Sequence, residues 1–475
     1  MSTQPFAPPA LGVGMVYFPS FEPLLQQCGE WLDVIEVEPQ AFWLRGTEGG
    51  VPRLDARVFD RLAALPQRKL LHGTGLPLAG SVPLDAQQAA PWRETIHRLQ
   101  PAWVSEHLAF ARVPDGASHH HAGFLLPPLQ SAETVNLAVQ RIAALRARSG
   151  RPVAFETAPN YLRPQPGEMA DGAFFAEVAE RADCGIVLDL HNLWCNERNG
   201  RQRVREVLEQ LPLERVWEVH LAGGQSHRGY WLDAHSDLVP GPVMALLEEW
   251  LPRLPRAGAV IFEILPEYVA AKGLSDEQLR GQIEAVKRLW NRRRRAPAAP
   301  PPPRRLPVED GLPAAHWERA LGALVNGRPA PGAPAWLAGD PGIAVYRALV
   351  ESGRAANLVE PLALSYRLLV LTLGDAATWQ LLRDFWAESW PQAQSLDEAL
   401  AFEAFIATRL ADGRLAVPNL HPVLAHELAH AQAAARQREL FVPFDSEAPA
   451  LLSALASGQL PAERLPGHYE VHGAG

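Results

Sequence analysis

The sequence has few cysteines, no long hydrophobic run and no basic excess. Cys28, Cys184 and Cys195 form no C-x-x-C pair, which argues against a thiolate zinc site and a disulfide framework and favours a reducing compartment. No apolar run approaches the ~20 residues of a membrane-spanning helix, and the N-terminal segment MSTQPFAPPALGVG resembles neither a signal nor a transit peptide. The net charge of -9 makes nucleic acid an unlikely partner. These absences predict a soluble, cytoplasmic protein in which any metal is bound through nitrogen and oxygen. The sequence carries no signal for an oligomeric state.

The length predicts two domains, because 475 residues exceed one ordinary hydrophobic core. The sharpest change in composition is NRRRRAPAAPPPPRRLP, from Asn291 to Pro307. Arginines and prolines together indicate a stiff, solvated linker, with a nucleic-acid or peptide-docking patch as the alternative. We therefore predict a first domain over residues 1–290, a linker over 291–309 and a second domain over 310–475.

Short apolar runs alternate with helical patterns before the linker: WLDVIEVEP, KLLHGTG, AWVSEHLAF, PVAFETAPN, GIVLDLHNL, VWEVHLAGG and AVIFEIL. Each run has the length of a buried strand, and repeated β-then-α units indicate parallel strands. The pattern predicts an α/β fold, a TIM (β/α)8 barrel over about residues 8–290, with an open doubly wound sheet as the alternative. Seven strands are clear, and the eighth is expected near Tyr230 to Pro240 or degenerate. After the linker only helical periodicity continues, which predicts a small all-α domain.

Most of the predicted strands end in a residue that can bind a metal. The strand-end residues are His72, His107, Glu156, Asp189, His220 and Glu263, and Asn192, Asp233 and His235 follow closely. The C-terminal ends of barrel strands meet around one mouth. Imidazoles and carboxylates gathered there repel and desolvate one another unless cations compensate them. The set is too large for one ion, so we predict a cluster of two or three.

Other polar residues near these strand ends have less certain roles. We expect five of them to support a metal ligand or to contact the substrate: Glu36, Glu38, Glu106, Asn160 and His191. The run from His119 to His121 is predicted to be a solvated loop, and Cys195 is predicted to be structural.

The motifs HGTGL, SEHLAF, FETAPNYL, LDLHN, EVHLAGG, DAHSD and FEI resemble the multinuclear non-haem iron-dependent oxidases, the family of the methanobactin biosynthesis enzyme. Their ligand order is also similar to that of the endonuclease IV and xylose isomerase barrels. The resemblance implies one metal on His72 and His107, with Glu156 bridging to a second. The second metal would add Asp189, His220 and Glu263, and a third would take Asn192, Asp233 and His235. Asn192 stands where trinuclear zinc phosphodiesterases typically have histidine, which favours iron. His191 departs from the family, which often has asparagine there.

The resemblance also implies an activity. It is the oxidation of a cysteine in a ribosomally made precursor peptide, with dioxygen as co-substrate and two or three iron ions of mixed valence. The product could be an oxazolone with a thioamide, or a residue that has lost a side-chain carbon. The alternatives are a divalent-metal sugar isomerase or phosphodiesterase, which needs no oxygen, and a binding module whose metal site has lapsed.

The second domain carries HELAH, from His426 to His430, which matches the H-E-x-x-H pattern of zinc peptidases. Only Glu447 and Glu463 are available as a third ligand, so a peptidase is a minor alternative. The other interpretation is an amphipathic helix with Val423, Leu424 and Leu428 inward and partly exposed histidines. The domain is also weakly similar to the helical partner proteins of these oxidases, which bind the precursor's leader. Fusion to such a partner would raise the peptide's concentration at the barrel mouth.

Overall fold

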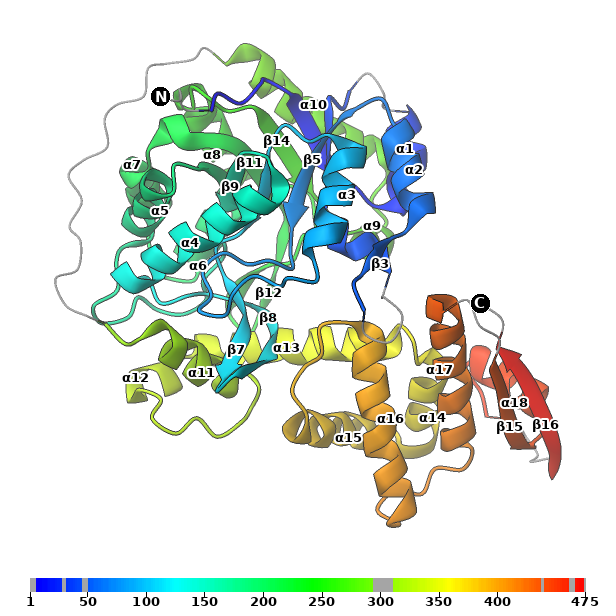
Figure 1. Cartoon of the computed structure of the whole chain (residues 1–475). Coiled ribbons are helices and arrows are strands. Elements are labelled where there is room, and N and C mark those ends of the chain that lie inside the picture. Colours follow the sequence, from blue (N-terminus) through cyan, green and yellow to red (C-terminus); the bar gives the residue numbers. More distant parts are fainter. Residues whose placement is uncertain are drawn as a thin grey trace.

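The computed structural model describes residues 6–27, 31–44, 50–293, 311–436, 440–460 and 466–473 (Figure 1). The side chains of residues 433–436, 440, 441, 445, 446 and 466–473 are not described. The predicted linker therefore lies outside the described residues, except where helix α10 (Asp276–Arg292) ends. Within the described part, no single helix is long and apolar enough to cross a membrane. Helices α13 (Gly342–Val359) and α14 (Ala363–Leu373), bent by 110°, meet that criterion only as a pair.

The first part of the chain is a closed barrel of parallel strands in the order β1-β14-β11-β10-β9-β6-β5-β2. The strands are β1 Gly12–Val16, β2 Val34–Val37, β5 Arg68–Gly73, β6 Val104–His107, β9 Val153–Glu156, β10 Gly185–Asp189, β11 Val216–Ala222 and β14 Ala259–Glu263. Their residues are almost all buried, as the continuous apolar runs require. The TIM barrel is confirmed, and the open-sheet alternative is excluded.

The eighth strand does not lie near Tyr230 to Pro240, and the other prediction, a strand with a degenerate apolar pattern, describes β1. Strand β1 closes the barrel by pairing with both β14 and β2. Its sequence, GVGMV, hides the apolar pattern because glycines occupy two of its positions. A Cβ at Gly14 would lie 2.2 Å from the carbonyl oxygen of Val34, so the close approach of β2 requires glycine. The segment predicted instead is β13 (Tyr230–Asp233), which forms an antiparallel pair with β12 (Gly224–His227).

Helices cover the outside of the barrel (Figure 1). With α10 they are α1 Glu22–Gln27, α2 Ala56–Ala64, α3 Ala89–Leu99, α4 Ala132–Ser149, α5 Asp171–Arg181, α6 Leu190–Arg198, α7 Val204–Gln210, α8 Gly241–Trp250 and α9 Pro266–Lys272. Capping side chains help to set the residue at which a helix begins. For example, Ser275 and Gln278 form a capping box at the start of α10. Two antiparallel pairs extend from the strand ends, β3 (Trp43–Leu44) with β4 (Arg53–Leu54) and β7 (Phe110–Asp115) with β8 (Ser118–Leu126).

The C-terminal region is helical, as predicted, but it is not all-α. Besides α13 and α14 its helices are α11 Ala314–Val325, α12 Ala335–Ala338, α15 Asp375–Glu388, α16 Ser395–Ala411, α17 Leu420–Arg436 and α18 Ala448–Ala456. Strands β15 (Leu440–Ser446) and β16 (Pro466–Gly473) add an antiparallel pair. The segment LFVPFDS is short and contains a proline, so it does not show the sustained alternation that predicts a strand.

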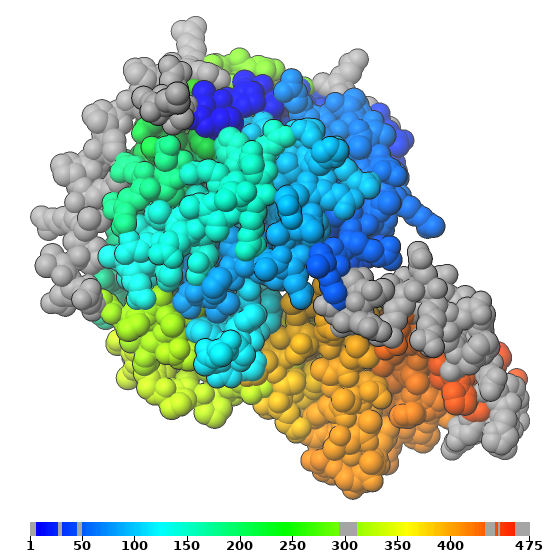
Figure 2. Space-filling model, viewed as in Figure 1, coloured from blue at the N-terminus to red at the C-terminus, as the bar shows by residue number. Residues whose placement is uncertain are grey.

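The β7–β8 hairpin and neighbouring loops of the barrel share a hydrophobic cluster with the first C-terminal helices, and this cluster is separate from the barrel's own core. Figures 1 and 2 show α11 and α13 against the cyan hairpin of β7 and β8. The shared cluster contains Phe110 and Val113 of the hairpin together with Trp317, Leu321 and Tyr346. A Cβ at Gly322 would lie 2.3 Å from a methyl group of Val113, so the helix and the hairpin pack closely. Residues on both sides of the predicted linker therefore depend on the same core.

A buried carboxyl group at this contact predicts a pH-dependent stability. Glu318 on α11 is 1% exposed and accepts the Ser81 backbone N–H at 2.6 Å. Burial raises the pKa of Glu318 from 4.5 to about 7, although Ser81 and Arg141 oppose the shift. A raised folded-state pKa means that the protonated form stabilises the fold below pH 4.5. That contribution is lost as the pH rises to 7, and the change is at most about 3 kcal/mol.

We expect Glu318→Gln to flatten the fall in thermal stability between pH 4.5 and 7 relative to the parent protein. Glutamine cannot ionise, whereas its carbonyl oxygen can still accept the Ser81 N–H. Glu403→Gln, half-buried on α16, is the matched control and should keep the parent slope. Equal slopes for all three proteins would contradict the assignment.

Candidate metal centre

The barrel mouth gathers the predicted strand-end residues. Each lies at or near the C-terminal end of a parallel strand, and all except His107 are less than 5% exposed: His72, Glu156, Asp189, His220 and Glu263. Three groups of His, Asp and Glu side chains here could each hold a metal ion. They are His72 with His107 and Glu156, Glu36 with His220 and Glu263, and Glu156 with Asp189 and His220. Glu156 and His220 each belong to two groups, so the groups are adjacent.

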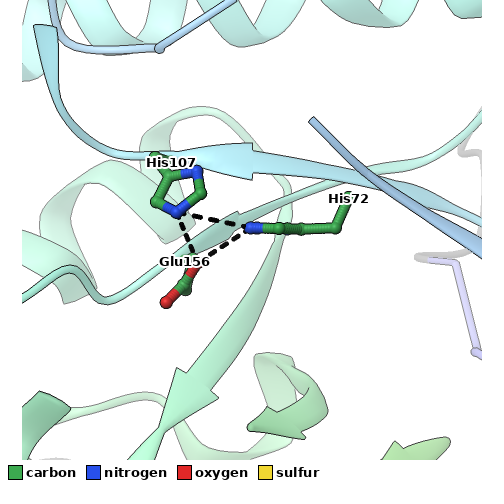
Figure 3. A group of neighbouring side chains, drawn as sticks. All are labelled: His72, His107 and Glu156. Carbon is green, nitrogen blue, oxygen red and sulfur yellow. Dashed lines mark hydrogen bonds and ion pairs between the residues drawn. The ribbon is translucent and has the colours of Figure 1, made fainter. Parts of the chain in front are cut away.

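The first group has a geometry that fits one cation (Figure 3). Nε2 of His72 and Nε2 of His107 lie 2.9 and 3.1 Å from Oε2 of Glu156, and 3.5 Å from each other. Such separations are those of neighbouring ligand atoms around a single ion with bonds of about 2.0–2.2 Å.

Hydrogen bonds on the far side of both imidazoles fix their tautomers. Nδ1 of His107 lies 3.1 Å from the Gly73 carbonyl oxygen, which can only accept, so Nδ1 carries a proton. The Ser105 hydroxyl donates to the Leu71 carbonyl oxygen, so it accepts from Nδ1 of His72 at 2.9 Å. When the rings are neutral, as ligation of a metal requires, both Nε2 atoms therefore present lone pairs to the Glu156 carboxylate. Lone pairs and negative charge converge on one point, which a cation would stabilise.

The second group is fully enclosed by the barrel. Nε2 of His220 lies 3.1 Å from Oε1 of Glu36, and Nδ1 lies 3.4 Å from Oε2 of Glu263. An imidazole binds a metal through one nitrogen and usually donates from the other to a carboxylate. If Nδ1 is the ligand atom, Glu36 is the acceptor that orients the ring. The sequence indicated a supporting role for Glu36 but not its partner.

The third predicted set is only partly brought together. Nε2 of His235 lies 3.2 Å from Oδ1 of Asp233 and 3.6 Å from Oε2 of Glu263. Asn192 instead donates from Nδ2 to Oε1 of Glu156 at 3.0 Å. Among the described residues, Oδ1 of Asn192 and Oδ2 of Asp189 are buried without a hydrogen-bond partner. Such unpaired oxygen atoms are costly, and ligation of a cation would satisfy them.

Without a cation the charges of the site are poorly balanced. Burial, followed by repulsion from Asp233 and Glu156, raises the pKa of Asp189 well above its usual value. Burial also raises the pKa of Glu36 to about 7, with Glu218 adding to the shift and His220 opposing it. Burial opposes ionisation of His107, but Glu156 and Glu106 outweigh it and raise its pKa to about 10. Ligand sets of this kind compete for protons when no metal is present.

The remaining predicted residues lie around the cluster. Glu38 is half-buried; burial raises its pKa, His72 opposes this shift, and Glu263 adds to it. Glu106 accepts the Leu76 N–H at 2.7 Å and so holds the loop after β5. Asn160 accepts the Leu162 N–H at 3.0 Å and stabilises its own loop. His191 lies 3.0 Å from Asp233, although a regular strand pattern points it away, because α6 begins at Leu190.

The run from His119 to His121 is not a solvated loop. It forms part of β8, and His121 accepts the Gly123 N–H at 3.0 Å. The preceding Asp115 and Gly116 are a hairpin signal, and Gly116 has a φ of +57°. Ser105 is a supporting residue that the sequence pattern did not single out. It precedes His107 by two positions on a strand, and this spacing is a signal that its side chain points inward as well.

The HELAH motif has a structural role for its glutamate. The backbone N–H groups of Leu364 and Ser365 donate to Glu427 at 2.6 and 2.8 Å, which caps the start of α14. Val423, Leu424 and Leu428 pack inward, as the amphipathic interpretation predicts. His426 is buried rather than partly exposed. The possible metal groups among the described residues include neither His426 nor His430, and Glu463 lies outside the described part.

A family model for the RiPP precursor modification enzymes MbnB/TglH/ChrH, which act on ribosomally made peptides, matches residues 12–283, the whole barrel. The chain belongs to this family. Among its relatives, a UPF0276 protein of Anaeromyxobacter sp. (strain Fw109-5) is 33% identical over 192 residues, 40% of this chain. One of Chromobacterium violaceum is 30% identical over 195 residues, 41% of this chain. The matches span 66% and 69% of these relatives, and 48% of a Streptomyces avermitilis relative.

Solved structures with a similar fold include 3-keto-D-glucoside 4-epimerase YcjR from E. coli and endonuclease IV from Thermus thermophilus. Each has 15% identity and a TM-score of 0.37. They cover 59% and 58% of this chain, and this chain covers 99% of each. At these scores the likeness adds nothing to the closed barrel described above. Membership of the family makes the chain one of a group of enzymes that modify precursor peptides.

Proposed function

We propose that this protein is a multinuclear iron-dependent oxidase that uses dioxygen to modify a cysteine in a ribosomally made precursor peptide. The observation that carries the metal assignment is the convergence of the Nε2 atoms of His72 and His107 on Glu156. Hydrogen bonds to the Nδ1 atoms of the two rings fix their tautomers. His72, His107 and Glu156 would hold one ion. Asp189, His220 and Glu263 would hold a second, and Asn192, Asp233 and His235 a third.

The donor set supports a redox metal of intermediate hardness. Imidazole and carboxylate ligands suit iron, and no thiolate takes part. When bound, iron supplies open positions for a thiolate and dioxygen and can change valence, which zinc cannot. The chain's own residues fix the ligand rings, exclude water from the barrel interior and compensate the charge of the ions.

A groove of 590 Å³ beside the mouth gives the peptide a route. Its walls come from loops that follow β2 and β5, from the β7–β8 hairpin and from residues 390–397 of the helical region. Five glutamines and two tryptophans line it: Gln40, Gln87, Gln88, Gln392, Gln394, Trp43 and Trp390. Primary amides can both donate to and accept from a peptide backbone. The groove reaches Thr74 and Gly75, close in sequence to His72, which supports a role for the helical region in holding the substrate.

The test is metal content and oxygen dependence. We expect protein purified without oxygen to contain two or three irons per chain by plasma mass spectrometry. We also expect it to consume oxygen and change the mass of a cysteine-containing precursor peptide. Zinc alone, with turnover of a ketohexose or bis(p-nitrophenyl) phosphate without oxygen, would favour a sugar isomerase or phosphodiesterase instead.

A further inference from the structure

Asp233 is connected to the helical region by a chain of hydrogen bonds. The Asp233 backbone N–H donates to the Tyr161 hydroxyl at 3.0 Å. The Tyr161 backbone N–H donates to the Tyr346 hydroxyl on α13 at 3.3 Å, and Tyr346 donates to the Pro159 carbonyl oxygen at 3.4 Å. Both tyrosines are at most 3% exposed, and their rings are 5.2 Å apart. Tyr346 therefore fixes the loop that fixes Asp233.

The carboxylate of Asp233 is held separately by His191. The Trp231 indole N–H can only donate, and it lies 3.1 Å from Nε2 of His191. Nδ1 of His191 therefore carries the proton and donates to Oδ1 of Asp233 at 3.0 Å. A Cβ at Gly224 would lie 2.6 Å from the Trp231 indole nitrogen, so glycine leaves room for this arrangement. The side chain and the backbone of Asp233 thus have different supports.

Asp233 needs such support because its strand is short, and His235 follows that strand by two residues. Strand β13 is four residues long, and in the part of the chain that the structure describes its only strand partner is β12; a two-stranded hairpin without further packing is marginally stable. His235 also has a φ of +46°, a conformation that non-glycine residues keep only when their surroundings enforce it. The hairpin alone therefore does not fix the positions of these two side chains.

We propose that Tyr346 is a positioning residue for the metal ion bound by Asp233 and His235, and that it acts through Tyr161. The helical region would then complete the metal centre as well as contact the peptide. This inference rests on the ligand set assigned under the proposed function. It makes the affinity for one ion depend on a hydroxyl group in the helical region, while the ion on His72, His107 and Glu156 is unaffected.

The experiment compares Tyr346→Phe and Tyr161→Phe in the full chain. Metal-free protein is titrated anaerobically with Fe²⁺, and bound metal is counted by equilibrium dialysis. Co²⁺ absorption reports the coordination. We expect one ion to bind about 10- to 100-fold more weakly in each variant, with the other ions unchanged. Asp233→Ala identifies that ion by its loss. Tyr366→Phe, on α14 and packed in the separate helical core, is the matched control and should bind as the parent does.

The outcomes separate the two proposals. If the parent protein binds no stoichiometric metal, the proposed ligand set fails and this inference falls with it. If the parent binds three ions and Tyr346→Phe binds them equally well, the inference alone is wrong. Equal weakening of every ion, together with a lower unfolding temperature of the metal-free protein, would show general destabilisation and would also overturn it.

Discussion

Glu156→Gln is expected to lose at least two metal ions, with affinities reduced by about 100-fold or more. Oε2 of Glu156 lies within 3.1 Å of both His72 and His107, and Oε1 accepts from Asn192. The same carboxylate belongs to two of the three possible metal groups. Glutamine keeps the shape but removes the charge and one acceptor oxygen. Plasma mass spectrometry of protein loaded without oxygen, together with oxygen uptake, measures the effect.

The matched control is Glu177→Gln on α5. Its carboxylate contacts Arg181 at 3.9 Å on the barrel's outer surface, and its side chain is 20% exposed. We expect this variant to keep the parent metal content and oxygen uptake. If Glu156→Gln binds as many metal ions as the parent protein, Glu156 does not bridge two ions. The first ion would then be held by His72 and His107 alone.

The barrel and the convergence of the strand-end residues at one rim could be predicted because both depend on a simple regularity. Parallel strands in a barrel bring their C-terminal ends to one rim, so a metal-binding residue at the end of each apolar run is sufficient to predict convergence. His72, Glu156 and Glu263 follow this rule. Strand β1 escaped prediction because its two glycines interrupt the apolar pattern, and one of them, Gly14, serves the close approach of the β2 backbone.

The contacts around the ligands could not be predicted because they join segments far apart in sequence. Tyr346 and Tyr161 are 185 residues apart, and His191 and Asp233 are 42 apart. No local pattern marks such pairs. The HELAH motif shows the opposite limit, since a short local match offered a zinc peptidase as a minor alternative, whereas in the fold its Glu427 caps a helix.

Trp317→Ala is expected to destabilise the protein by about 3–5 kcal/mol. Trp317 on α11 is 1% exposed, and its indole N–H donates to the Pro127 carbonyl oxygen at 2.9 Å. Alanine would leave a cavity in the core shared with the β7–β8 hairpin and an unpaired carbonyl group. The measurement is urea unfolding followed by circular dichroism. Trp336→Ala is the matched control, because the Trp336 ring stacks on Trp317 with the ring centroids 6.2 Å apart but is 38% exposed. We expect this variant to lower the free energy of unfolding by less than about 1 kcal/mol.

The same variant tests whether the barrel and the helical region unfold together. Two independent domains joined by a linker would give two transitions, and Trp317→Ala would shift only the helical one. The shared core predicts a different result, because Phe110 and Val113 extend from the barrel into the cluster around Trp317. We expect the barrel transition to shift as well, with loss of the metal ion on Asp233 and His235 at lower urea concentrations. An unchanged barrel transition would show that the hairpin contact contributes little, and it would weaken the case that Tyr346 positions a metal ligand.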